Sequence, residues 1–170
     1  MTRQALFHKW FLYALALFPV WLLDARILSR YPLFGVRPML LPLAVVAVAV
    51  LEGSHAGAGF GLGVGLLWAL AYSSGKGMMV IGLTLVGLLT GAAAQYALSQ
   101  SFLGCLLCSA GALAAIDLWR IAVRLFVRSA GWTSMLRVAV PEILWSLAWT
   151  PLVYLIFHAV YRRVGGSRLA

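Results

Sequence analysis

Long apolar runs alternate with short polar segments along the whole chain, and six of these runs are candidate membrane-spanning helices. A spanning helix needs about 20 apolar residues and must satisfy its backbone polar groups within itself. The pattern predicts an all-α integral membrane protein with about six transmembrane helices in one bundle, forming a single domain over residues 1–170. The expected spans are approximately 10–28, 38–51, 56–72, 78–98, 102–127 and 141–161, and the longest polar connection is expected at 128–137.

The first two expected spans differ from an ordinary membrane helix. Basic residues precede the first apolar run, as in a signal peptide, but no small-residue cleavage site follows it, so we expect a retained helix. Its last turn carries Asp24, Arg26 and Arg30, whose side chains can snorkel to the membrane interface. The second run, at about 14 residues, is short and must tilt, thin the bilayer or be shielded by its neighbours.

Glycines recur at helical spacing in the third and fourth expected spans. Small residues four apart form a stripe that lets two helix backbones approach closely in lipid. A nucleotide-binding glycine motif would need a preceding strand and a G-x-G-x-x-G pattern, which the run does not have. We therefore expect helix packing at Gly53, Gly57, Gly61, Gly65, Gly87 and Gly91, with a second stripe formed by Gly59 and Gly63.

Charged residues are rare inside the expected spans, and the fifth span holds the most informative ones. Asp117 is followed by Arg120 and Arg124, which share approximately one helical face with it. They form either an internal Asp117–Arg120 pair with Arg124 reaching lipid headgroups, or a polar patch that meets a partner membrane protein or lines a substrate cavity. Glu142 directly follows Pro141 and is expected to favour the first turn of the sixth helix through the helix dipole.

Residues that could support chemistry are few. Glu52 and His55 lie at the tip of the expected hairpin between the second and third spans, where solvation at the membrane interface explains both. Cys105 and Cys108 are three apart within an apolar helix and are expected to be small packing residues. The sequence thus predicts no catalytic, cofactor-binding or metal-binding residues, no cofactor and no enzymatic activity.

Composition supports the membrane assignment and limits the partners. Of the 170 residues, 64% are hydrophobic and only 10% are charged, whereas about a quarter of a soluble domain is charged. The net charge of +9 is spread over many short segments without an aromatic-interleaved basic face. Contacts with membrane lipid headgroups explain it better than nucleic acid does.

The order of features along the chain resembles the rod shape-determining MreD family. The resemblance covers nearly the whole chain, from a first helix through a short leucine-rich helix to two glycine-bearing helices and a proline-containing last helix. The segments that carry it are Gly35-Val36-Arg37-Pro38, Gly57-x-Gly59-Phe60, Gly63-x-Gly65-Leu66-Leu67, Ser74-Gly75-x-Gly77, Pro141-x-x-Leu144-Trp145 and Pro151-Leu152-Val153-Tyr154.

The resemblance implies a non-enzymatic, multi-pass component of the bacterial inner membrane that acts as a scaffold in the cell-elongation machinery. Its implied partners are an MreC-like protein, the RodA glycosyltransferase with its class B penicillin-binding protein, and the cytoskeletal MreB. Asp117 falls where the family often carries an acidic residue in its fifth helix.

A transport function is the alternative. The MreD fold is similar to that of the substrate-binding subunits of energy-coupling-factor transporters, which bind a vitamin or a metal ion. Such a subunit needs a polar cavity, for which the chain offers Gln95, Gln100, Asp117 and Ser146. A third reading, a small enzyme of lipid or cell-wall metabolism, would need a paired nucleophile and base or a metal cluster.

Overall fold

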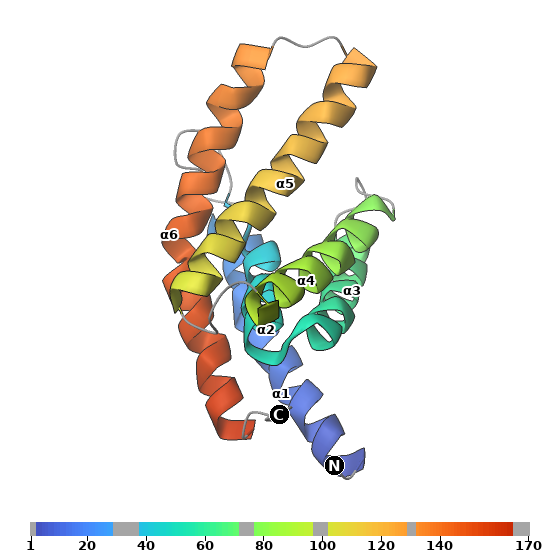
Figure 1. Ribbon diagram of the computed structural model, residues 1–170, viewed down its shortest axis with the longest axis vertical. Coiled ribbons are helices and arrows are strands. Elements are labelled where there is room, and N and C mark those ends of the chain that lie inside the picture. The colour runs from blue at the N-terminus through green and yellow to red at the C-terminus, as the bar shows by residue number, and fades with distance from the viewer. Residues whose placement is uncertain (1–2, 29–37, 72–76, 97–101, 129–131, 165–170) are drawn as a thin grey trace.

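The computed structural model describes residues 3–28, 38–71, 77–96, 102–128 and 132–164, and the side chains of residues 7–26, 38–70, 77–96, 102–122 and 139–164 (Figure 1). Apart from short connections, this part of the chain is helical and contains no strand, so the predicted all-α class is confirmed. The elements are α1 (Arg3–Leu22), the π-helical turn η1 (Leu23–Leu28), α2 (Leu40–Glu52), α3 (Ser54–Ala71), α4 (Met78–Tyr96), α5 (Phe102–Arg128) and α6 (Trp132–Val164).

Three helical segments in the described part of the chain are long and apolar enough to cross a membrane. They are Met78–Tyr96 in α4, Phe102–Ala122 in α5 and Ala139–Val164 in α6. Two further apolar helices, Leu40–Glu52 and Ser54–Leu70, are shorter than a full crossing requires. These segments support the prediction that the chain is a membrane protein.

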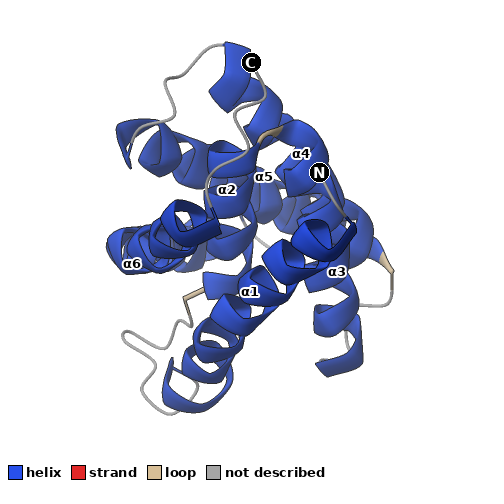
Figure 2. Ribbon diagram, turned by 90° about the horizontal axis from the view of Figure 1, so that it is seen from below, coloured by secondary structure: helices blue, strands red, loops and turns tan. Residues whose placement is uncertain are grey.

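Helix α2 forms the centre of the molecule. All of its side chains from Leu40 to Leu51 are buried, as expected for a helix that is hydrophobic on every face. Helices α1, α3, α4, α5 and α6 all pack against it (Figure 2). With 13 residues it is about 20 Å long, less than the hydrocarbon thickness of about 30 Å. Its neighbours therefore shield this short helix, which is one of the ways to accommodate it in a bilayer.

Glycines bring α3 and α4 into backbone contact. A Cβ atom added to Gly57 would lie 2.6 Å from the carbonyl oxygen of Gly87, and one added to Gly65 would lie 2.7 Å from the Cα atom of Val80. A Cβ at Gly61 would overlap the carbonyl oxygen of Leu83. The stripe of glycines four apart therefore lies in the contact between the two helices, where a larger residue could not fit.

The remaining glycines of this region have other surroundings. Gly53 has a φ of 95° and ends α2, so it makes the reversal into α3, which a residue with a side chain would adopt only with strain. Gly91 lies against the start of α3, where an added Cβ would be 2.5 Å from the Cα atom of Ser54. Gly59 and Gly63, the second stripe, are exposed and have nothing within 4 Å of an added Cβ.

Helix α6 is longer than the sequence pattern predicted. It begins at Trp132 rather than at the expected residue 141, and it continues through Pro141 and Pro151 to Val164. The expected polar connection at 128–137 was therefore wrong, because most of it is helical. A proline removes one backbone hydrogen bond from a helix, but membrane helices tolerate it because neighbouring groups satisfy the freed carbonyl.

Helices α5 and α6 form a long hairpin that extends past the ends of α3 and α4 (Figure 1). In this hairpin α5 continues to Arg128 and α6 begins at Trp132. The start of α1 and the end of α6 lie at the other end of the molecule. The end of α5 and the start of α6 therefore lie opposite the start of α1 and the end of α6.

Candidate functional site: charged clusters at the two ends of α2

The first charged cluster surrounds the beginning of α2 and is called the start cluster. It consists of Asp24 from η1, Asp117 and Arg120 from α5, and Glu142 and Ser146 from α6. The first backbone N–H groups of a helix have no partner within the helix and carry a partial positive charge. The cluster supplies acceptors for two of these N–H groups.

Two side chains cap α2 directly. The N–H of Leu40 donates to Asp24 Oδ1 over 3.4 Å, and the N–H of Met39 donates to Ser146 Oγ over 3.0 Å. Asp24 is buried, so the expectation that it snorkels to the interface was wrong. The partial positive charge at the beginning of α2 stabilises its carboxylate at this buried position. Asp24 also belongs to a π-helical turn, a feature often found at functional sites.

Arg120 connects α5 to α6 within the start cluster. Its Nη1 atom lies 3.5 Å from Asp117 Oδ1 and 3.1 Å from Glu142 Oε1. The contact with Asp117 is the internal pair that the three-residue spacing in the sequence indicated. The role expected for Glu142 was wrong, since this residue lies well inside α6 and accepts a hydrogen bond from another helix instead of supporting a first turn.

The carboxylates and the guanidinium of the start cluster differ in exposure. The side chains of Asp117 and Glu142 are 9% and 13% exposed, whereas that of Arg120 is 37% exposed. The cluster thus faces the surface of the molecule through its arginine. Arg124 belongs to α5, but its side chain lies outside the described residues.

The second charged cluster lies at the other end of α2 and is called the end cluster. Lys9 Nζ is 2.5 Å from Glu52 Oε2, and the Tyr13 hydroxyl donates to Glu52 Oε1 over 2.7 Å. The side chains of Lys9 and Glu52 are only 10% and 3% exposed. The expectation that Glu52 is solvated at an interface was therefore wrong.

Aromatic rings enclose the end cluster. The ring of Tyr13 lies 6.2 Å from that of Phe157 and 6.3 Å from those of Phe60 and Trp10, measured between centroids. Lys9 and Tyr13 are four residues apart on α1, which puts them on one face. That spacing was the one sequence signal for this cluster, although it did not reveal the partner on α2.

Other candidate residues are distributed over the molecule. His55 is exposed at the beginning of α3. Cys105 and Cys108 are buried and free, and the Cys108 thiol donates to the carbonyl of Thr90 over 3.9 Å. Among the residues with described side chains, no three His, Cys, Asp or Glu groups are placed to hold a metal ion.

The polar residues considered for a transport cavity do not all lie together. The Ser54 hydroxyl donates to Gln95 Oε1 over 3.5 Å beside the end of α2, whereas Ser146 contacts Met39 at its beginning. Asp117 is in the start cluster with Ser146. Gln100 lies outside the described residues.

Comparison with protein-family models, curated proteins and solved structures finds no match. The function must therefore be inferred from the two clusters and the fold.

Both clusters join helices: Lys9 and Glu52 join α1 to α2, and Arg120 joins α5 to α6. The end cluster is closed to its surroundings, whereas the start cluster exposes part of a guanidinium. Only the start cluster has a charged group that an outside molecule can reach.

Proposed function

We propose that the chain is a non-enzymatic scaffold protein of the bacterial cell-elongation machinery, of the MreD type, in the inner membrane. The observation that carries the proposal is the packing of the glycine-bearing segments on which the sequence resemblance rests. Gly57 and Gly65 allow α3 to contact α4, and Phe60 packs in the aromatic cluster around Tyr13. The segments that carry the resemblance are separate in the sequence, but they belong to one packed unit around α2.

Six crossings of the membrane belong to this proposal. Helices α4, α5 and α6 each contain a segment long enough to cross, and α1 adds 20 helical residues. Helix α2 contacts little lipid because its neighbours enclose it, so its short length has little cost from hydrophobic mismatch. An even number of crossings agrees with the start of α1 and the end of α6 at the same end of the molecule (Figure 1).

The outer faces of the bundle are suited to contacts with lipid and with partner helices. Large apolar side chains project from α1 and α4, where Phe7 is 80% exposed and Leu89 is 62% exposed. The open glycines Gly59 and Gly63 leave the backbone of α3 accessible to a neighbouring helix. A scaffold needs such unoccupied faces, because its function is to hold other membrane proteins.

In this proposal the α5–α6 hairpin contacts the partner, and the start cluster positions the hairpin. Arg120 joins the two helices about two turns before the end of α5, so it sets how residues 123–128 and 132–138 of the hairpin are presented. The proposed partners are an MreC-like protein, RodA with its class B penicillin-binding protein, and MreB. The transport alternative has less support, because Gln95 and Ser146 lie at opposite ends of α2.

Co-purification tests the proposal. The protein is expressed at its native level with an affinity tag, and an MreC-like protein and RodA are measured in the eluate by quantitative mass spectrometry. Asp117→Asn should reduce both, because a neutral amide holds Arg120 less firmly than a carboxylate does. Arg163→Gln is the control, since Arg163 is exposed at the far end of α6.

Depletion of the protein provides the second part of the test. Rod-shaped cells should become round as the protein is lost, while the amounts of MreC-like protein in the membrane stay constant. Cells that keep their shape, together with an eluate that lacks every elongation protein, would refute the scaffold function. Equal recovery of partners with wild type and Asp117→Asn would refute only the role of the start cluster.

A further inference from the structure

Arg120 uses only one of its nitrogen atoms for contacts with the described part of the protein. Its Nη1 atom lies near Glu142 Oε1, Asp117 Oδ1 and the sulfur of Met39, the last at 3.9 Å. A guanidinium has five N–H donors arranged as a planar fork. The Nη2 and Nε donors form no hydrogen bond or ion pair with any described residue, and the side chain is 37% exposed. One edge of the fork is therefore fixed and the other is open.

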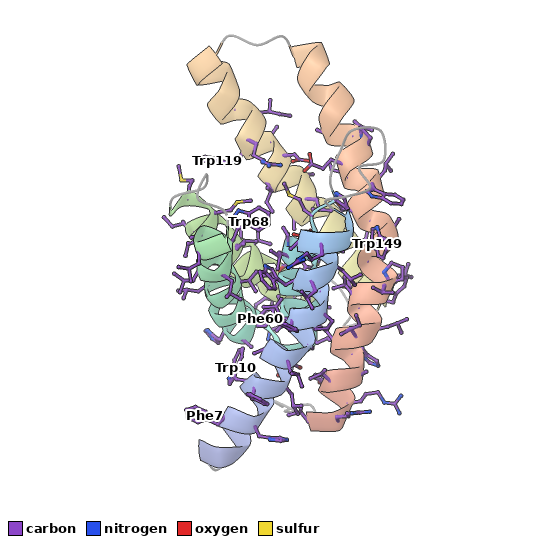
Figure 3. The ribbon with its side chains drawn as sticks, turned by 180° about the vertical axis from the view of Figure 1, so that it is seen from behind. Phe7, Trp10, Phe60, Trp68, Trp119 and Trp149 are labelled. Carbon is purple, nitrogen blue, oxygen red and sulfur yellow. The ribbon has the colours of Figure 1, made fainter. Side chains whose placement is uncertain are left out.

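The residues beside Arg120 indicate a position near the membrane interface. Next to Arg120, Leu118 and Trp119 are 65% and 55% exposed. Exposed tryptophan is enriched at the membrane interface because its ring is apolar and its N–H is polar. Trp119 and Phe7 lie toward opposite ends of the molecule (Figure 3).

We propose that Arg120 binds the phosphodiester group of a membrane phospholipid, with Trp119 beside the lipid glycerol. Two phosphate oxygens match the Nε and Nη2 donors of a guanidinium in a bidentate arrangement. Asp117 and Glu142 hold Nη1, so the free edge is preorganised and loses little side-chain entropy on binding. The exposed Leu118 favours a lipid over a soluble phosphate, because it can contact an acyl chain.

The two carboxylates also restrict which phospholipid binds best. They reduce the positive potential at Arg120, although neither is free of other contacts. A headgroup that carries an ammonium group beside its phosphate can place that group near the carboxylates, whereas a purely anionic headgroup cannot. We therefore expect phosphatidylethanolamine to bind more tightly than phosphatidylglycerol, and both to bind more tightly than diacylglycerol, which has no phosphate.

Native mass spectrometry of the full-length protein in detergent tests the site. Delipidated protein is incubated with phosphatidylethanolamine, phosphatidylglycerol, diacylglycerol or inorganic phosphate, and the bound fraction is measured. Wild type should retain one phospholipid. Arg120→Lys keeps a positive charge for Asp117 and Glu142 but loses the second donor edge, so we expect about tenfold weaker phospholipid binding. Arg163→Gln should bind as wild type does.

Trp119→Leu keeps the proposal testable if Arg120→Lys does not fold, because it leaves the ion pairs of Arg120 unchanged. We expect about threefold weaker phospholipid binding from this variant, because the interfacial indole is lost. Unchanged phospholipid binding by every folded variant would overturn the site. Equal binding of diacylglycerol or of inorganic phosphate would overturn the assignment to a phospholipid. The proposal does not rest on the scaffold function, since the protein is measured without any partner.

Discussion

The two ends of α2 hold their charges in opposite ways. At the end cluster, Lys9 and Glu52 are both buried and are enclosed by the rings around Tyr13. At the start cluster, Arg120 is partly exposed and uses one edge of its guanidinium. A closed ion pair can only hold helices together, whereas an open one has donors left for another molecule. We therefore propose a structural role for the end cluster and a binding role for the start cluster.

Removal of one charge from the closed end should have the largest effect. Lys9→Met leaves the buried carboxylate of Glu52 without its cation, and breaking a buried ion pair in this way costs about 3–5 kcal/mol. We expect this loss in the free energy of unfolding, measured by titration with a denaturing detergent.

The double variant Lys9→Met/Glu52→Gln is the matched control for the closed end. It removes both charges, so it should recover most of the stability lost in Lys9→Met. A double variant as unstable as the single variant would show that Lys9 contributes through something other than its pair with Glu52.

The glycine stripes of α3 repeat the contrast between closed and open. Gly61→Leu introduces a side chain against the backbone of α4 at Leu83, and overpacking of this kind costs about 1–3 kcal/mol. Gly63→Leu introduces the same side chain where nothing lies within 4 Å of the added Cβ. Thermal unfolding in detergent should show a clear fall in melting temperature for the first variant and little or no fall for the second. Equal falls would contradict the assignment of the two faces.

The smallest effect is expected at the open end. Glu142→Gln leaves Arg120 paired with Asp117 and partly solvated, so we expect a loss of less than about 1 kcal/mol in the free energy of unfolding. The same detergent titration measures it. A loss as large as that of Lys9→Met would mean that the start cluster is as closed as the end cluster.

The sequence predicted the helical class and most helix positions, because apolar runs and turn residues are local signals. The Asp117–Arg120 pair was also predictable, since the two residues are three apart on one helix. The beginning of α6 was missed because Pro141 was interpreted as a first-turn residue, although it lies within a continuous helix. Proline marks a helix start in soluble proteins more reliably than inside a membrane bundle.

The pair of Lys9 with Glu52 could not be predicted from spacing, because its members are 43 residues apart and on different helices. The same holds for the contact of Arg120 with Glu142 and for the cap that Asp24 provides to α2. Each depends on which helices pack together.

The amino-acid sequence by itself determined that the chain forms apolar helices with glycine stripes and few internal charges. These properties depend on run length and on residue spacing along one helix. The tertiary structure decided which glycine stripe lies against α4, which stripe stays open, and which charges are buried or exposed. The physical reason is that burial and ion pairing arise between helices distant in sequence. The enclosure of α2 brings these helices to its two ends.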